Sequence, residues 1–505
     1  MKPDGYRRWH DARPHAVIIG SGFGGLAAAV RLGSRGYRVT VCERLDAPGG
    51  RASVLRQDGF KFDAGPTIVT APQLFAELWA LAGSRLEDDV ELRPLDPFYR
   101  IRFDDGETLD CVAKAEEMRS RIARLAPGDV AGYDRFMALS RRLCEVGFER
   151  LGDVPFGTPM DMVRALPDLV RLQAWRSVHG LVARHVRDPR VRFALSFHPL
   201  FVGGNPFSVP AIYALIADLE RRWGVHYAMG GTGRLVDGLA GLVEKLGGTL
   251  RFGAEVASIS LRGRRACGVV LSSGEYVEAQ VVVSNADAAW TYAKLLPEGV
   301  SPRWTAARLG RARHSMGLFV WYFGTRRRYE SVPHHTIVLG PRYRGLLDDI
   351  FTRRVLAPDF SLYLHRPTAT DASMAPPGCD AFYVLAPVPH LTADVDWRVQ
   401  AEPYRQAIAR RLEETVLPGL GEALATSRVM TPLDFQERYL ATHGAAFGLE
   451  PLLGQSAWFR PHNAAEGIDN LFLVGAGTHP GAGLPGVLCS ARILDRVVPP
   501  AHAFA

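Results

Sequence analysis

An apolar run near the start of the chain ends abruptly at a cluster of glycines. Residues 17–19 are β-branched, a composition typical of a buried strand. Four glycines lie within residues 20–25, and residues 26–32 are rich in alanine and leucine, which favours a helix. Gly36 predicts the end of this helix, and residues 38–43 have the pattern of a second strand. The sequence therefore predicts a strand–turn–helix–strand unit here.

Patterns of the same kind return much later in the chain, after a long stretch with a different character. The other predicted elements are strands at 99–103 and 108–112 within a mainly helical stretch at 68–224, a helix at 235–246, strands at 250–252, 256–261, 267–271, 277–286 and 316–323, and a strand beginning at 470 that is followed by a helix at 488–497. Residues 290–440 combine strands and helices with many aromatic residues and prolines.

The glycines and one acidic residue indicate what the first unit binds. Gly20, Gly22 and Gly25 permit a tight turn, close approach of a pyrophosphate, and close packing of the helix on the strand. The N-terminus of the helix supplies free N–H groups for phosphate. Glu43 ends the second strand, where a carboxylate can accept hydrogen bonds from ribose hydroxyls. This order of elements predicts dinucleotide binding.

Two further glycine-rich segments favour FAD as the dinucleotide. Gly49, Gly50 and Arg51 follow the second strand directly, and residues 62–67 read FDAGPT. An extended FAD needs such loops beyond its ADP half, with the arginine screening pyrophosphate or flavin charge. The alternative is an ordinary turn with a solvated arginine. Near the C-terminus, the glycine- and proline-rich residues 475–487 lead into a helix whose N-terminus suits an anionic flavin.

These patterns predict an α/β fold in which distant segments build one Rossmann-like FAD-binding domain. A mixed-sheet substrate domain and a helical subdomain, a candidate for membrane docking, are interleaved with it. The predicted boundaries are 15–75, 225–290 and 455–500 for the FAD-binding domain, 76–115 and 291–454 for the substrate domain, 116–224 for the helical subdomain, and 1–14 for a disordered lead-in.

Composition narrows the class of protein further. The 505 residues are 47% hydrophobic and carry a net charge of +7, which is mild for this length and accompanies no nucleic-acid motif. An anionic membrane surface is the better partner for this excess. The six cysteines are scattered without CxxC pairing, which indicates reduced thiols in the cytoplasm rather than disulfides or a zinc site. No apolar run is long enough to cross a bilayer.

Motifs along almost the whole chain, from about residue 15 to 497, resemble those of the bacterial and fungal phytoene desaturases. These are FAD-dependent carotenoid desaturases within the amine oxidase superfamily, so an amine-oxidase-like FAD domain is implied. The segments that carry the resemblance are 20–25 with Glu43, 49–51, 62–67, 196–206, 224–227, 284–287, 334–336, 386–389, 455–463 and 475–483.

The resemblance implies successive removal of hydrogen from 15-cis-phytoene to give neurosporene- or lycopene-type carotenes. A hydrocarbon offers no carbonyl to a nucleophile, so a flavin hydride acceptor carries the chemistry and a base or water takes the proton. Quinone or oxygen is the expected final electron acceptor. The predicted cofactor-binding residues are Gly20, Gly22, Phe23, Gly24, Gly25, Glu43, Arg44, Gly49, Gly50, Arg51, Gly65, Pro66, Thr67, Val256, Asn285, Gly475, Ala476, Gly486 and Val487.

Catalytic side chains are poorly determined by the sequence. Polar residues inside the family motifs are the candidates, first His334, His335 and Arg460, and then His198, His365 and Asp371. Each has the alternative of being a hydrogen-bonded structural residue at a loop or domain junction. The adjacent histidines do not indicate a metal pair, because neighbouring strand positions point to opposite faces. No metal is predicted.

A hydrocarbon substrate dissolved in a bilayer requires a surface that docks to the membrane. Residues 159–190 combine apolar side chains with arginines in a helical pattern typical of the membrane interface, although the apolar stripe can equally pack on the protein's own core. The residues concerned are Met160, Met162, Val163, Leu166, Leu169, Val170, Leu172, Trp175, Val178 and Leu181 with Arg164, Arg171, Arg176, Arg184 and Arg187.

Two other classes of function stay open on the sequence. One is another flavoenzyme of the superfamily: a later-pathway carotenoid desaturase, isomerase or ketolase, or an amine or porphyrinogen oxidase. An amine oxidase needs an aromatic cage beside the flavin, and the sequence assigns none. The other class is a non-catalytic prenyl-protein escort with the same fold. The intact glycines at both ends of the chain argue against it.

Overall fold

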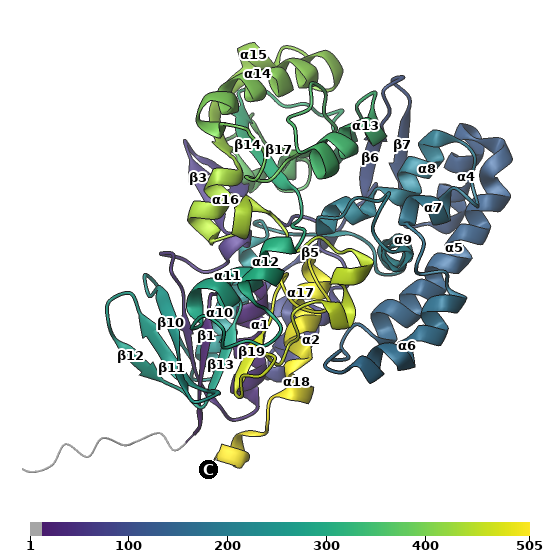
Figure 1. The fold of residues 1–505 in the computed structure, drawn as a ribbon. Helices are drawn as coiled ribbons and strands as arrows, with labels where there is room; N and C mark the ends of the chain where they lie inside the picture. Colours follow the sequence, from purple (N-terminus) through teal and green to yellow (C-terminus); the bar gives the residue numbers. More distant parts are fainter. Residues whose placement is uncertain (1–12, 505) are drawn as a thin grey trace, which may run out of the picture.

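The computed structural model describes residues 13–504, and a parallel five-stranded sheet lies at its centre (Figure 1). Its strands come from both ends and the middle of the chain, and purple, teal and yellow ribbons lie side by side in the figure. In spatial order they are β19 (Leu471–Leu473), β13 (Val281–Ser284), β1 (His15–Ile19), β2 (Arg38–Cys42) and β9 (Thr249–Arg251).

Both faces of this sheet are buried, as the β-branched sequence of β1 requires. Ala16 and Ile18 pack in one core with four helices, whereas Val17 and Ile19 pack in another core beneath a three-stranded antiparallel sheet. The helices are α1 (Phe23–Ser34), α2 (Gln73–Leu81), α10 (Gly233–Lys245) and α17 (Leu484–Arg492), and the covering strands are β10 (Val256–Arg262), β11 (Arg265–Leu271) and β12 (Tyr276–Glu278).

The second large sheet has seven strands of mixed direction, because β15 runs parallel to β6 while the other neighbours are antiparallel. The spatial order is β18 (Leu424–Met430), β14 (Gly317–Thr325), β17 (Asp380–Val388), β16 (Leu362–His365), β15 (His335–Val338), β6 (Tyr99–Arg102) and β7 (Thr108–Cys111). The α/β class with one parallel Rossmann-like sheet and one mixed sheet is therefore confirmed.

Residues 115–223 form a region of helices, drawn in blue in Figure 1. It contains α4 (Ala115–Leu125), α5 (Val130–Cys144), α6 (Pro159–Arg171), α7 (Val178–Val182), α8 (Pro189–Ser196) and α9 (Leu215–Trp223). Within residues 13–504, no helix combines the length and the apolar composition that crossing a bilayer would require.

The remaining elements connect these layers, and most of them are short. They are α3 (Leu86–Asp89), α11 (Ala288–Trp290), α12 (Ala306–Arg311), α13 (Tyr343–Asp348), α14 (Trp397–Thr415), α15 (Leu420–Ala423), α16 (Pro432–Tyr439), α18 (Leu494–Val497), β3 (Val54–Gln57), β4 (Phe60–Asp63), β5 (Leu92–Pro94) and β8 (His226–Ala228). The exact domain boundaries stay a prediction, and the expected lead-in at 1–14 lies almost wholly outside the described residues.

Two predicted elements were wrong in extent. The strand expected at 277–286 is two strands in different sheets, because β12 ends at Glu278 and β13 begins at Val281. The helix expected at 488–497 is two helices, α17 and α18. The first begins at Leu484 rather than 488, since Pro485 fits the first turn, where its missing N–H is not needed.

A buried carboxyl makes stability depend on pH. Glu450 is fully buried, 3.1 Å from the Arg313 guanidinium, and burial raises its pKa from 4.5 to about 7. The folded state thus holds this proton more tightly than the unfolded state, and the contribution to stability falls as pH rises from about 4.5 to 7. We expect Glu450→Gln to raise the free energy of unfolding at pH 8 by up to about 3 kcal/mol. Urea unfolding at pH 5 and pH 8 measures this, and an equal effect at both pH values contradicts it.

Candidate flavin and substrate site

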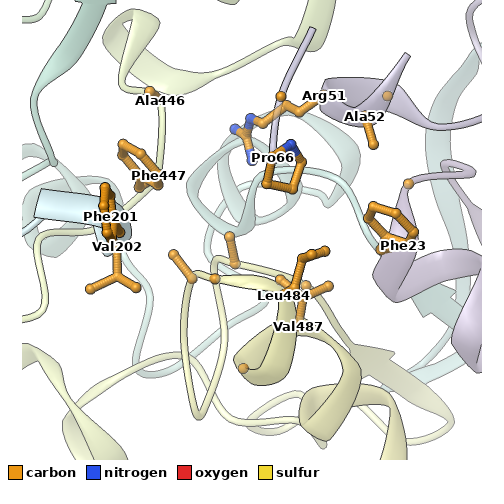
Figure 2. Close-up of a pocket in the computed structure, with 18 of the residues that line it drawn as sticks. Phe23, Arg51, Ala52, Pro66, Phe201, Val202, Ala446, Phe447, Leu484 and Val487 are labelled. Carbon is orange, nitrogen blue, oxygen red and sulfur yellow. The ribbon is translucent and has the colours of Figure 1, made fainter. Parts of the chain in front are cut away.

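One large cavity, of about 530 Å³, runs between the parallel sheet, the mixed sheet and the helical region. At one end its wall is formed by the loops after β1 and β2 and by the loop before α17. At the other end the wall is mainly apolar, and in Figure 2 Phe201, Val202 and Phe447 lie across the cavity from Phe23 and Arg51. The two ends therefore differ in chemistry, and both open into the same space.

Two helices point uncapped N-termini at this cavity. The N-terminal residue Gly22 of α1 and the corresponding Gly483 of α17 both line the cavity, and neither helix has a side chain that caps its first N–H groups. Free N–H groups and the positive end of the helix dipole favour a negatively charged group. The cavity thus carries two anion-binding helix ends, one from each end of the chain.

Glycines let the two ends of the chain approach one another here. A Cβ atom on Gly24 would lie 2.5 Å from Asn285 Oδ1 and 3.0 Å from the backbone of Gly475. A Cβ atom on Gly25 would lie only 2.0 Å from the Gly20 carbonyl oxygen. The seam between α1, β13 and the loop after β19 therefore has no room for any side chain at these positions.

Two charged residues complete the glycine-rich end of the cavity, which is its nucleotide end. The Glu43 carboxylate accepts hydrogen bonds from the Ser21 backbone N–H and hydroxyl, both at 2.7 Å, and from the Leu45 N–H at 2.9 Å. These bonds fix the carboxylate at the cavity wall. Arg51 also lines the cavity, burial lowers its pKa, and its buried Nε has no hydrogen-bond partner in the protein. A buried donor without a partner fits a site that receives an anionic ligand.

Comparison with known proteins identifies the fold and its chemistry. The model of the flavin-containing amine oxidoreductase family matches residues 23–493. The chain is 50% identical to the neurosporene-forming phytoene desaturase of Cereibacter sphaeroides, over 96% of this chain and 95% of the relative. It is also 50% identical to the lycopene-forming phytoene desaturase of Pseudescherichia vulneris, over 94% of this chain and 97% of the relative. The chain belongs to the phytoene desaturases of the flavin-containing amine oxidoreductase family.

Solved structures of proteins with much lower identity have the same fold. An oxidoreductase from Methanosarcina mazei aligns with a TM-score of 0.66 at 18% identity, covering 95% of this chain and all of that chain. A putrescine oxidase aligns with a TM-score of 0.64 at 14% identity, covering 97% of this chain and 99% of that chain. At such low identity these likenesses concern the fold alone. Membership of the flavin amine oxidoreductase family implies a flavin cofactor.

The cofactor-binding residues predicted for this chain lie together in the structure. All of them except Gly25 line the cavity, and Gly25 lies just behind its wall, where it packs α1 onto the turn at Gly20. The residues at the wall fit a bound flavin dinucleotide, since they offer two uncapped helix ends, a glycine cradle and an unpartnered arginine donor.

The candidate catalytic residues lie elsewhere, because none of the six lines this cavity. Arg460 is fully buried and donates to the carbonyl oxygens of Leu449 at 3.1 Å and Ala476 at 2.8 Å, so it supports the cavity wall from behind. Asp371 accepts from the backbone N–H groups of Gly230 and Ser373, as a turn residue does.

The expectation that His334 and His335 point to opposite faces was wrong. Strand β15 begins only at His335, and the irregular backbone at His334 turns its ring towards the same side. The two ring centroids are 4.6 Å apart, and both rings pack against His365.

Sequence reasoning missed two carboxyls that line the cavity and the aromatic rings of its apolar end. Glu220, on α9, lines the cavity among phenylalanines, accepts a 2.7 Å hydrogen bond from the Tyr99 hydroxyl, and lies 3.3 Å from His198. Asp287 lines the cavity near Arg51 and stands in a motif that the sequence did single out. Glu220 has no comparable signal in the sequence, because only packing places α9 against the cavity.

Proposed function

We propose that this protein is an FAD-dependent phytoene desaturase that converts phytoene to neurosporene- or lycopene-type carotenes. The observation that carries the proposal is one cavity with a nucleotide end and an apolar end, in a chain half identical to enzymes with this activity. The apolar end suits a long hydrocarbon, which offers no charge or hydrogen bond and is held by contact area alone.

Different residues bind the cofactor and the hydrocarbon at the two ends of the cavity. The glycines beside α1 and α17 hold the cofactor phosphates and ribityl chain, and Arg51 balances their charge. When bound, the flavin supplies the hydride acceptor that the reaction needs. The aromatic and aliphatic wall, including Phe197, Phe201 and Leu318, aligns the hydrocarbon and excludes water. Glu220 is a carboxyl in this wall that can take up the proton that the substrate loses.

Expression in cells that accumulate phytoene tests the activity directly. We expect the extract to change from colourless to yellow or red, with the absorption bands of neurosporene or lycopene. Release of the cofactor from purified protein by heat, followed by chromatography, distinguishes FAD from FMN. Unchanged phytoene in the presence of folded, flavin-loaded protein and either oxygen or a quinone would refute the proposed function.

The substrate dissolves in bilayers, and we propose that α6 and the segment after it dock to the membrane surface. Five large apolar side chains here are between 51% and 57% exposed, namely Met160, Val163, Leu166, Val170 and Trp175. Arg164, Arg171, Arg184 and Arg187 are also exposed in the same region. Leu172, Val178 and Leu181 are buried instead, so the docking face is shorter than the expected stripe.

The position of this face suits transfer of substrate from a bilayer. The cavity wall includes Gly147, Phe148 and Gly152, and α6 begins only seven residues further on, at Pro159. Figure 1 places α6 at the outer edge of the molecule, below α5 and α9. An exposed apolar stripe flanked by arginines binds anionic lipid surfaces. The docking face therefore follows a segment of the cavity wall directly in the sequence.

Replacing apolar residues on this face should weaken membrane binding. We expect Val163→Asp with Leu166→Asp to lower the affinity for anionic phosphatidylglycerol vesicles more than tenfold, because two apolar side chains that would enter the bilayer become charges that repel the lipid. Flavin absorbance should not change. The matched control is Val399→Asp on α14, which is 63% exposed and outside the face. Vesicle co-sedimentation measures both, and equal binding by all variants removes α6 from the docking role.

A further inference from the structure

Three histidines form a closed cluster outside the cavity. His335 on β15 and His365 on β16 face each other in register across the two strands, and His334 precedes β15. The ring centroids are 4.6 to 5.2 Å apart, and one ring nitrogen from each residue lies within 4.8 Å of the other two. All three side chains are buried. Three imidazoles packed so closely present several ring nitrogens to one small space.

The outer hydrogen bonds of two rings leave a lone pair on the inner nitrogen of each ring. His334 Nδ1 lies 2.7 Å from the Thr370 hydroxyl, and His335 Nδ1 lies 2.7 Å from the Tyr363 hydroxyl. With protons on these Nδ1 atoms, both Nε2 atoms carry lone pairs, which is the arrangement that outer oxygen partners give to metal-binding histidines. His334 Nε2 and His365 Nε2 are 3.1 Å apart. Tetrahedral zinc with nitrogen ligands separates its donors by about 3.3 Å.

Two nitrogens in the cluster have no partner in the protein. His335 Nε2 and His365 Nδ1 are buried and make no hydrogen bond. Buried polar atoms without partners in such a cluster point to a missing ligand.

We propose that His334, His335 and His365 bind one zinc ion in a structural site. Imidazole nitrogens suit zinc among the divalent metals, and three of them leave a fourth position for an oxygen ligand. The Tyr227 ring packs 4.7 Å from the His334 ring, and its hydroxyl is buried without a partner. Two buried carboxyls, Asp63 and Asp371, lie near Tyr227.

The site would hold together parts of the molecule that are distant in sequence. His335 and His365 belong to the mixed sheet, and Tyr227 lies on β8, which precedes α10 of the parallel-sheet region. His335 also contacts Tyr363, which lines the cavity and shares the Thr67 hydroxyl with Tyr383. The ion would therefore fix the far side of the cavity wall without touching cofactor or substrate.

Metal analysis of the full-length, tag-free, flavin-loaded protein tests this site. After growth with added zinc and gel filtration, we expect mass spectrometry to find one zinc per chain. Protein stripped with a chelator and given cobalt should show the visible absorption of tetrahedral cobalt, beyond the flavin bands. Zinc should also raise the melting temperature of the stripped protein. Folded, yellow protein that retains less than about a tenth of an equivalent after zinc is added overturns the proposal.

Variants assign the metal to these residues. We expect His365→Ala to bind at least tenfold less zinc than the wild-type protein. His185→Gln, which removes a half-buried histidine in the turn after α7, should keep the zinc. Zinc retained by folded His365→Ala overturns the assignment. Should that variant not fold, the zinc stoichiometry and the cobalt spectrum of the wild-type protein decide. These readouts do not depend on carotene formation, so failure here is distinct from failure of the proposed function.

Discussion

Gly25→Ala is expected to abolish flavin binding and to destabilise the fold by about 3 kcal/mol. The added methyl group would lie 2.0 Å from the Gly20 carbonyl oxygen and 3.3 Å from Asn285 Cβ. Neither neighbour can yield easily, because Gly20 is backbone in a tight turn and Asn285 follows a central strand. Helix α1 would have to move away from β1, which opens the seam where both ends of the chain meet. Urea unfolding and flavin absorbance after gel filtration measure the two effects.

The matched control is the same substitution at an exposed helical glycine. Gly241 lies in α10, and a Cβ atom there meets nothing within 4 Å. Gly241→Ala should keep full flavin content and stabilise the protein by up to about 1 kcal/mol through helix propensity. A yellow, stable Gly25→Ala protein would mean that α1 does not pack on the turn as described.

Phe201→Asp is expected to lower carotene formation at least a hundredfold while leaving flavin bound. The Phe201 ring lines the apolar end of the cavity, 5.3 Å from the Phe197 ring and 6.0 Å from the Tyr363 ring (Figure 2). A hydrocarbon in this space would bury the new carboxylate without a partner, at a cost of several kcal/mol. About 3 kcal/mol corresponds to a factor of a hundred. Phytoene conversion on vesicles, normalised to bound flavin, is the measurement.

Phe201→Leu separates the effect of charge from the loss of the ring. It keeps the wall apolar and should retain activity within about tenfold, because only part of the contact area is lost. Equal activity of the Asp and Leu variants would show that the hydrocarbon does not pass Phe201. Loss of flavin from the Asp variant would show that the wall supports the cofactor as well.

The nucleotide end of the site could be predicted because its residues are local in sequence. The run at 17–19, the glycines after it and Glu43 form one short unit whose spacing itself fixes a strand, a turn and a helix end. The loop at 475–487 has the same property. Backbone requirements of this kind can be recognised in the sequence, since only glycine fits where a Cβ atom would meet another backbone at 2 to 3 Å.

The apolar end and the histidine cluster follow from tertiary packing alone. Glu220 reaches the cavity only because α9 packs against it, and nothing in the residues around it marks a carboxyl of the wall. His334, His335 and His365 meet for two reasons. Strand β15 pairs with β16, and His334 lies just before the regular strand, which begins at His335. His335 and His365 are thirty positions apart, and strand register is set by the whole sheet rather than by neighbours in sequence.

The exposed face of α6 lies between these cases. Its apolar and basic residues are evident in the sequence, and the same pattern fits a helix packed on a core. Only the structure decides that Val163 and Leu166 are exposed while Val178 and Leu181 are buried. The sequence by itself therefore determined the family, the nucleotide turn and the class of chemistry, because these depend on short-range spacing. The tertiary structure alone decided which side chains share a cavity, a cluster or a surface, because those contacts depend on how distant elements pack.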